Sequence, residues 1–240
     1  MSFNWSFAVK TFILCLKAIP TTLFITFLSL LLAVLPAFGI AMTRIKKQKP
    51  GSVLATIYIS FMRGTPIVLQ ILLVYSILPS LLNVFFKKFF PSVNVFDWPP
   101  VIYAVTVFTL NTIATLSEVF RSALMTVDKT QYEAALSLGL PPFFAFIKVV
   151  IPQSLVCAIP NLSDLTVALI KNTSLAFLMT VKDITAVAKI QASYGFNYIE
   201  SYTDIFLIYI IVCTIIQLIY KFLEKRLKKS GIEIKSHTKK

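Results

Sequence analysis

Long apolar runs constrain this 240-residue chain more than any other feature, because a helix needs about 20 predominantly apolar residues to cross a bilayer. The spans that the runs predict are about 19–42, 53–82, 101–125, 143–179 and 202–222. We expect the fourth span to be broken, because Pro152 and Pro160 lie within it. The sequence therefore predicts an all-α, polytopic membrane protein with about five transmembrane helices.

The composition excludes two other classes of protein. With 57% hydrophobic and 14% charged residues, the chain is too apolar for an ordinary soluble domain and for a disordered one. The net charge is +13, and four, three and eight of the 23 basic residues lie in 43–57, 121–150 and 221–240. These charges flank membrane spans, so they do not indicate nucleic-acid binding.

With five spans, those three basic segments fall on one side of the membrane. The positive-inside bias then places the N-terminus outside and the C-terminus in the cytoplasm of a multi-pass cell-membrane protein. We expect an extracytoplasmic flank (1–18), a transmembrane domain (19–225) and a basic cytoplasmic tail (226–240).

The chain contains few residues that could carry out catalysis or bind a metal. The chain has one histidine, His237, and three scattered cysteines, so we expect no catalytic residue and no metal site. It has no Gly-Lys dipeptide and hence no Walker A loop, so any nucleotide hydrolysis has to occur on another chain.

The predicted cytoplasmic loop 126–142 contains a short helix signal. Thr130 and Glu133 have the spacing of a capping box, and Gly139 followed by Pro141 should end the helix. Such a helix suits docking into a groove on a partner, and an ordinary surface helix explains the pattern equally well.

The same segment resembles a known family. The residues Glu133-Ala134-Ala135, then Gly139, then 151–153 (I-P-Q), resemble the EAA signature of ABC importer permeases. Three further segments resemble the polar amino acid branch of that family: R-G-T-P at 63–66 with Gln70, E-V-F-R at 118–121, and K-N-T-S-L at 171–175. The chain departs from the family pattern at Val156, where arginine is common, and at Asp164, where asparagine is common.

This resemblance implies a type I ABC importer permease, with Glu133, Ala134, Ala135 and Gly139 coupling it to an ATPase. The implied partners are a cytoplasmic ABC ATPase dimer, a second permease subunit (the same chain or a related one) and an extracytoplasmic solute-binding protein. ATP and Mg²⁺ would bind the ATPase, and this chain would bind no cofactor. Among family substrates the segments look closest to the cystine type, with glutamine and basic amino acids as rivals.

Polar residues inside the predicted spans are candidates for the substrate path, because they are costly at membrane depth. Asn111, Thr115 and Glu118 are spaced by four and three residues and share a helix face, and Asp164 and Lys171 are seven apart on another. Contacts between helices explain them as well, and Glu118 has the spacing to pair with Arg121.

The segment around Pro66 predicts a distorted helix, because Pro66 lacks a donor and Gly64 adds backbone freedom. A gate or hinge formed by this segment would comprise Arg63, Gly64, Thr65, Pro66 and Gln70. A kink that serves packing alone, with Arg63 reaching the cytoplasmic face, is the alternative.

Two other functions remain as rivals. A stand-alone secondary transporter or channel for small polar solutes would need its own coupling-ion site, and the absence of an internal repeat argues against it. A membrane-embedded enzyme would need a convergent catalytic cluster, which the sequence does not offer.

Overall fold

The structure is a computed structural model that describes residues 3–47, 49–90 and 92–229, all of them in helices or short connections. Its elements in chain order are α1 (Trp5–Leu16), α2 (Ile19–Ile45), α3 (Gly51–Gly64), α4 (Ile67–Phe89), the 3₁₀ turn η1 (Val95–Asp97), α5 (Pro100–Thr126), α6 (Lys129–Ser137), α7 (Pro142–Ala145), the π-helical turn η2 (Phe146–Val150), α8 (Ile151–Asn172), the 3₁₀ helix η3 (Thr173–Met179), α9 (Ile184–Gly195) and α10 (Tyr198–Lys229). The all-α prediction is confirmed for these residues.

Within the described ranges, five segments are long and apolar enough to cross a membrane, as predicted. They are Trp5–Ile45, Ile67–Phe89, Pro100–Thr126, Pro142–Met179 and Tyr198–Lys228. The first begins well before the predicted start at 19, because the expected flank 1–18 contains the apolar helix α1, which buries Ala8, Thr11 and Cys15. Most of the predicted tail, residues 230–240, lies outside the described residues.

The predicted second span, 53–82, is two helices rather than one. Helix α3 ends at Gly64, and Thr65 and Pro66 are extended before α4 begins at Ile67. The reason is Pro66, whose ring and missing N–H disfavour the preceding helical turn. The predicted break in the fourth span lies at its N-terminal end, in α7 and η2, whereas Pro160 lies inside the continuous helix α8.

Helix α5 occupies the centre of the bundle, packed along α2 and α8. Helix α2 turns a column of small residues inward, since Ser29, Ala33, Ala37 and Ala41 follow one another at intervals of four and are each 0% exposed. Small side chains let helix backbones approach closely inside a membrane. The Ser29 hydroxyl donates to the Val105 carbonyl of α5 at 3.4 Å, so the two helices are joined by packing and by a hydrogen bond.

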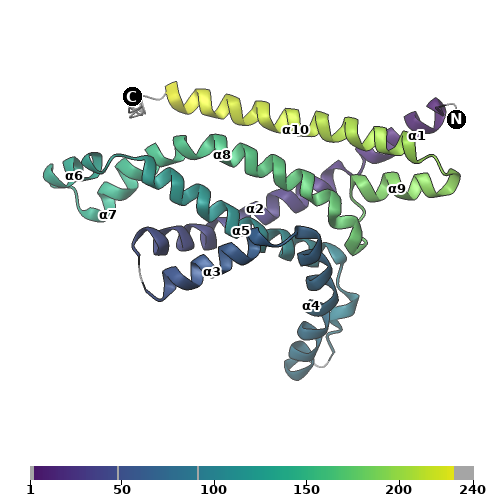
Figure 1. Ribbon diagram of the computed structural model, residues 1–240, viewed down its shortest axis with the longest axis horizontal. Coiled ribbons are helices and arrows are strands. Elements are labelled where there is room, and N and C mark those ends of the chain that lie inside the picture. The colour runs from purple at the N-terminus through teal and green to yellow at the C-terminus, as the bar shows by residue number, and fades with distance from the viewer. Residues whose placement is uncertain (1–2, 48, 91, 230–240) are drawn as a thin grey trace.

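Figure 1 shows the elongated arrangement that results. The long helix α10 lies along α8, with α1 and α9 at the end where α10 begins. The short helices α6 and α7 lie at the opposite end, where α10 finishes, and α4 projects away from this long axis. The molecule therefore carries the α6–α7 segment and the end of α10 on the same side.

Candidate functional site

Helix α6 begins at a different cap from the one predicted. The Asp128 side chain accepts a hydrogen bond from the Thr130 backbone N–H at 3.0 Å, and the helix starts at Lys129. The predicted capping box of Thr130 and Glu133 is therefore wrong, because the N-cap residue is Asp128, two residues before Thr130. Asp128 is an equally good cap residue, and its negative charge also suits a helix N-terminus.

The end of α6 follows the prediction. Gly139 has φ +82°, a left-handed conformation that glycine adopts without the steric cost of a Cβ atom. The Leu140 N–H donates to the Ala135 carbonyl at 3.1 Å, and the Gly139 N–H donates to the Leu136 carbonyl at 2.9 Å. These two bonds form a Schellman motif, which fixes the direction in which the chain leaves α6.

The predicted coupling residues occupy different environments. Glu133, Ala134 and Gly139 are exposed, whereas Ala135 is 5% exposed and is the buried residue of α6. Helix α6 packs against α7 and η2. One face of α6 thus joins the bundle, while the other offers Glu133, Ala134 and the apolar side chain of Leu136 to the surroundings.

The break between α3 and α4 is held by two amide side chains. Gln70 Nε2 donates to the Met62 carbonyl at 2.8 Å, and to the Thr65 carbonyl and hydroxyl at 3.1 and 2.8 Å. Asn111 Nδ2 of α5 donates to Gln70 Oε1 at 3.1 Å and to the Met62 carbonyl at 3.4 Å. Residues from two separate predictions, Gln70 from the gate and Asn111 from the path, therefore belong to one network.

An apolar hollow of about 340 Å³ lies beside this break. It is lined by Phe61, Met62, Thr65, Leu69, Gln70, Leu73, Val74, Val107 and Leu110. The exposed Arg63 and Gly64 end α3 next to it, so the chain has open space around the break. The hollow itself offers few polar groups to a charged solute.

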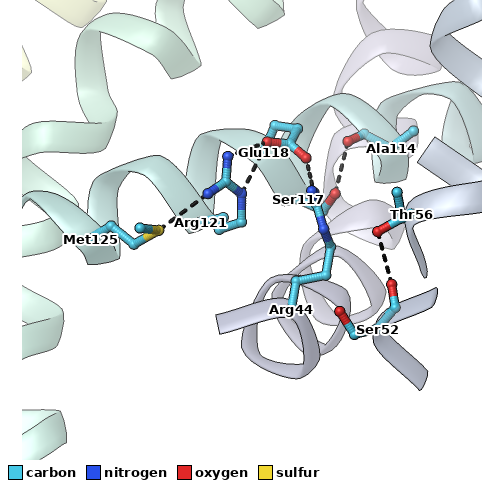
Figure 2. Close-up of polar contacts among 8 residues, drawn as sticks. All are labelled: Arg44, Ser52, Thr56, Ala114, Ser117, Glu118, Arg121 and Met125. Carbon is cyan, nitrogen blue, oxygen red and sulfur yellow. Dashed lines mark hydrogen bonds and ion pairs between the residues drawn. The ribbon is translucent and has the colours of Figure 1, made fainter. Parts of the chain in front are cut away.

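Glu118 joins two arginines from different helices (Figure 2). Its carboxylate forms an ion pair with Arg44 of α2 through Oε1 and with Arg121 through Oε2, the second at 2.9 Å. The predicted pairing with Arg121 is therefore confirmed, and Arg44 is a partner that the sequence did not indicate. The Glu118 side chain is 20% exposed, so this cluster ties α2 to α5 largely out of contact with solvent. Thr115 lies on the same face, its hydroxyl bonded to the Asn111 carbonyl at 3.3 Å.

The polar face of α8 differs from that of α5. Asp164 and Lys171 are both exposed, and in the described part of the chain neither forms an ion pair. Asp164 borders a polar hollow of about 220 Å³ between α8 and α10. Its lining includes groups that the sequence analysis missed: Ser163, Gln217, Tyr220, Lys221 and Glu224.

The segment after η3 contains another residue that the sequence analysis missed, the buried Asp183. It caps α9 by accepting hydrogen bonds from the backbone N–H groups of Thr185 and Ala186, at 3.1 and 2.9 Å. Burial raises the pKa of Asp183 to about 6, although these hydrogen bonds favour the charged form. An aspartate three residues before Ala186, at the start of an apolar run, is a cap signal that the sequence contained.

None of the described residues form a group of three or more His, Cys, Asp or Glu side chains that could hold a metal ion. The structure instead presents a bundle with a broken second span, a short surface helix and an exposed polar face on α8. These features, with five segments long and apolar enough to cross a membrane, define a polytopic membrane protein.

The comparisons with known proteins identify the class. The sequence matches the family described as binding-protein-dependent transport system inner membrane component over residues 35–229. The chain therefore belongs to this family, and it is the membrane-spanning permease subunit of such a transport system.

Relatives of the chain carry more specific names. The probable amino-acid permease protein YxeN of Bacillus subtilis is 31% identical, with 94% of this chain and 96% of that protein covered. The L-cystine transport system permease protein TcyL of Bacillus subtilis is 33% identical, with 90% and 88% covered. Among solved structures, an amino acid ABC transporter crystallised with histidines matches with a TM-score of 0.78 and 28% identity, over 94% of this chain and all of that one.

Proposed function

We propose that this chain is the permease subunit of an ATP-driven importer for a polar amino acid, with L-cystine as the first substrate to test. The observation that carries the proposal is the match of the whole bundle to an amino acid ABC transporter, together with relatives that include the permease protein of an L-cystine transport system. Glutamine and basic amino acids are the rival substrates.

In this proposal α6 docks into a groove on a cytoplasmic ABC ATPase dimer. Glu133, Ala134 and Gly139 are exposed for such a contact, and Ala135 anchors α6 to the bundle. ATP and Mg²⁺ bind the ATPase, a second permease subunit completes the pathway, and an extracytoplasmic binding protein delivers the solute. The α6 end of the molecule, which also carries the end of α10, then faces the cytoplasm of a cell-membrane protein whose N-terminus is outside.

We place the substrate path along α8 and beside the α3–α4 break. Asp164 and Lys171 supply opposite charges for the ammonium and carboxylate groups of an amino acid, and both are exposed in the single chain. The break at Thr65 and Pro66, held by Gln70, supplies a joint at which α3 and α4 change their angle. Closure of the ATPases would shift this bundle between an outward-open and an inward-open state.

A matched pair of glycine substitutions tests the role of α6. At Gly39 and Gly139 an added Cβ meets nothing within 4 Å, but φ is positive at Gly139 alone of the two. We expect Gly139→Ala to lower amino acid uptake several-fold, because the left-handed conformation costs about 1–2 kcal/mol with a Cβ atom. Gly39→Ala should leave uptake intact.

Both variants should insert into the membrane at wild-type level, which quantitative blotting of membrane fractions checks. Glu133→Lys, which reverses an exposed charge of α6, should abolish uptake without affecting insertion. Unchanged uptake in Gly139→Ala and Glu133→Lys would rule out α6 as the docking element. Uptake that persists without ATP would instead favour a stand-alone secondary transporter or channel.

A further inference from the structure

The connection from α6 to α8 contains a widened helical turn. In η2 the Ile151 N–H donates to the carbonyl of Phe146, five residues back, instead of four as in an α-helix. Such π-helical turns are rare, and they occur frequently at functional sites. Here the turn lies between the proposed docking helix α6 and helix α8, along which we place the substrate path.

Two adjacent residues explain why the helix widens at this place. Pro152 has no N–H, and an α-helical path would set its ring against the carbonyl four residues back, that of Lys148. Gln153 then supports the widened turn, because its side-chain Nε2 donates to the Val149 carbonyl at 3.0 Å. Pro152 thus disfavours the α-helical register, and Gln153 stabilises the π-helical one.

The docking helix packs directly on this turn. Helix α6 contacts both α7 and η2, and the buried residues of these three elements are Ala135, Ala145 and Val150, at 5%, 0% and 8% exposed. Each helical residue contributes about 1.5 Å of rise and about 100° of rotation. A change of register by one residue in η2 would therefore rotate and displace α6 relative to α8.

We propose that Pro152 and Gln153 are positioning residues that fix the angle between α6 and α8 by holding η2 in its π-helical register. They contact neither the solute nor ATP, and they act through the turn on which α6 rests. This inference rests on the proposed function, in which α6 transmits the motion of the ATPase. If η2 adopted the wrong register, ATP hydrolysis would continue, but α6 would no longer transmit the motion of the ATPase to α8.

The test compares import with ATP hydrolysis in proteoliposomes that contain the permease pair, its ATPase and its binding protein. Gln153→Glu keeps the shape of the side chain but removes the donor, and Pro152→Ala restores an N–H that favours the α-helical register. Gln153→Glu removes one hydrogen bond from the π-helical register, and Pro152→Ala adds one donor to the competing α-helical register. Since one such bond shifts an equilibrium by about fivefold, we expect each variant to import about fivefold less amino acid per ATP hydrolysed. Ser154→Ala is the matched control, since it removes a side-chain hydrogen bond to the Ile151 carbonyl, which lies just outside η2.

The ratio separates this role from a merely structural one, because a less stable subunit lowers import and hydrolysis together. A second measurement uses the chain alone in lipid nanodiscs, with spin labels at Ser137 of α6 and at Leu218 of α10. In a background where Cys15, Cys157 and Cys213 are alanine, both η2 variants should shift the label-to-label distance.

The outcomes distinguish the positioning role of Pro152 and Gln153 from the proposed function. Wild-type ratios and unchanged distances in both η2 variants would overturn the positioning role while leaving the proposed function standing. A wild-type complex that imports no amino acid with ATP would instead overturn the proposed function, and the distance measurement would still decide whether η2 sets the angle of α6.

Discussion

Replacing Glu118 with Gln should destabilise the helix bundle, because this carboxylate joins Arg44 of α2 to Arg121 of α5. The Glu118 and Arg44 side chains are each 20% exposed, so the pair lies between the buried and the surface cases. Breaking a fully buried pair by removing one partner costs about 3–5 kcal/mol, and exposed pairs contribute about 0–1 kcal/mol. We therefore expect the free energy of unfolding to fall by about 2 kcal/mol.

The chain provides a matched control in Glu224, which pairs with Lys228 at 2.6 Å on the surface of α10. The Glu224 side chain is 26% exposed, but its partner Lys228 is 60% exposed, against 20% for Arg44, so Glu224→Gln should cost less than about 1 kcal/mol. The measurement is the unfolding of purified protein in mixed detergent micelles, followed by circular dichroism at fixed salt. Arg44→Gln, alone and combined with Glu118→Gln, completes a double-mutant cycle that isolates the pair.

Two results would refute this reasoning. Equal losses of stability in Glu118→Gln and Glu224→Gln would show that the greater burial of Arg44, compared with Lys228, is energetically irrelevant. A cycle in which the Arg44 and Glu118 substitutions are simply additive would show that the two side chains do not stabilise each other, whatever their proximity.

Three further predictions follow from the same structure. Gln70→Leu should lower the free energy of unfolding by about 1–3 kcal/mol, because the Thr65 carbonyl loses its side-chain donor and the Met62 carbonyl keeps only the longer bond from Asn111. Unchanged unfolding would exclude a structural role for the amide. Asp164→Asn should alter the dependence of ATPase activity on amino acid concentration in the reconstituted complex, and an unchanged dependence would remove Asp164 from the path. Burial raises the pKa of Asp183 to about 6, so the folded state binds this proton more tightly than the unfolded state. Stability at this site should therefore rise as the pH falls from about 6 towards the ordinary carboxyl range, and Asp183→Asn should flatten that dependence in thermal unfolding at several pH values; a slope identical to wild type would contradict the assignment.

The sequence predicted those features that depend on local physics alone. The five spans follow from the length of apolar helix that a bilayer requires, whatever the helices pack against. The end of α6 follows from Gly139, because a left-handed residue after a helix needs no distant partner. The break at Pro66 follows from the geometry of its ring, although the sequence located a kink where the structure has two separate helices.

The features that we did not predict from the sequence are of two kinds. They depend either on competition between two possible cap residues or on contacts between residues that are far apart along the chain. Asp128 and Thr130 are both good cap residues, and the helix start that separates them depends on how the chain leaves α5. Arg44 lies 74 residues before Glu118, and Asn111 lies 41 residues after Gln70. Nothing in helical periodicity relates such pairs, since periodicity assigns residues to a face but does not name the helix opposite that face.

The polar faces of α5 and α8 were both predicted to line the substrate path. In the structure they differ in whether their polar groups already have partners within the chain. On α5, Asn111 bonds to Gln70, and Glu118 pairs with Arg44 and Arg121, so these groups are already used in joining helices. On α8, Asp164 and Lys171 are exposed without an ion pair in the described part of the chain. A charge at membrane depth has to be compensated by a protein group, by water or by a solute. This requirement favours the α8 face over the α5 face as the one that meets a second subunit, a wet path or the amino acid itself.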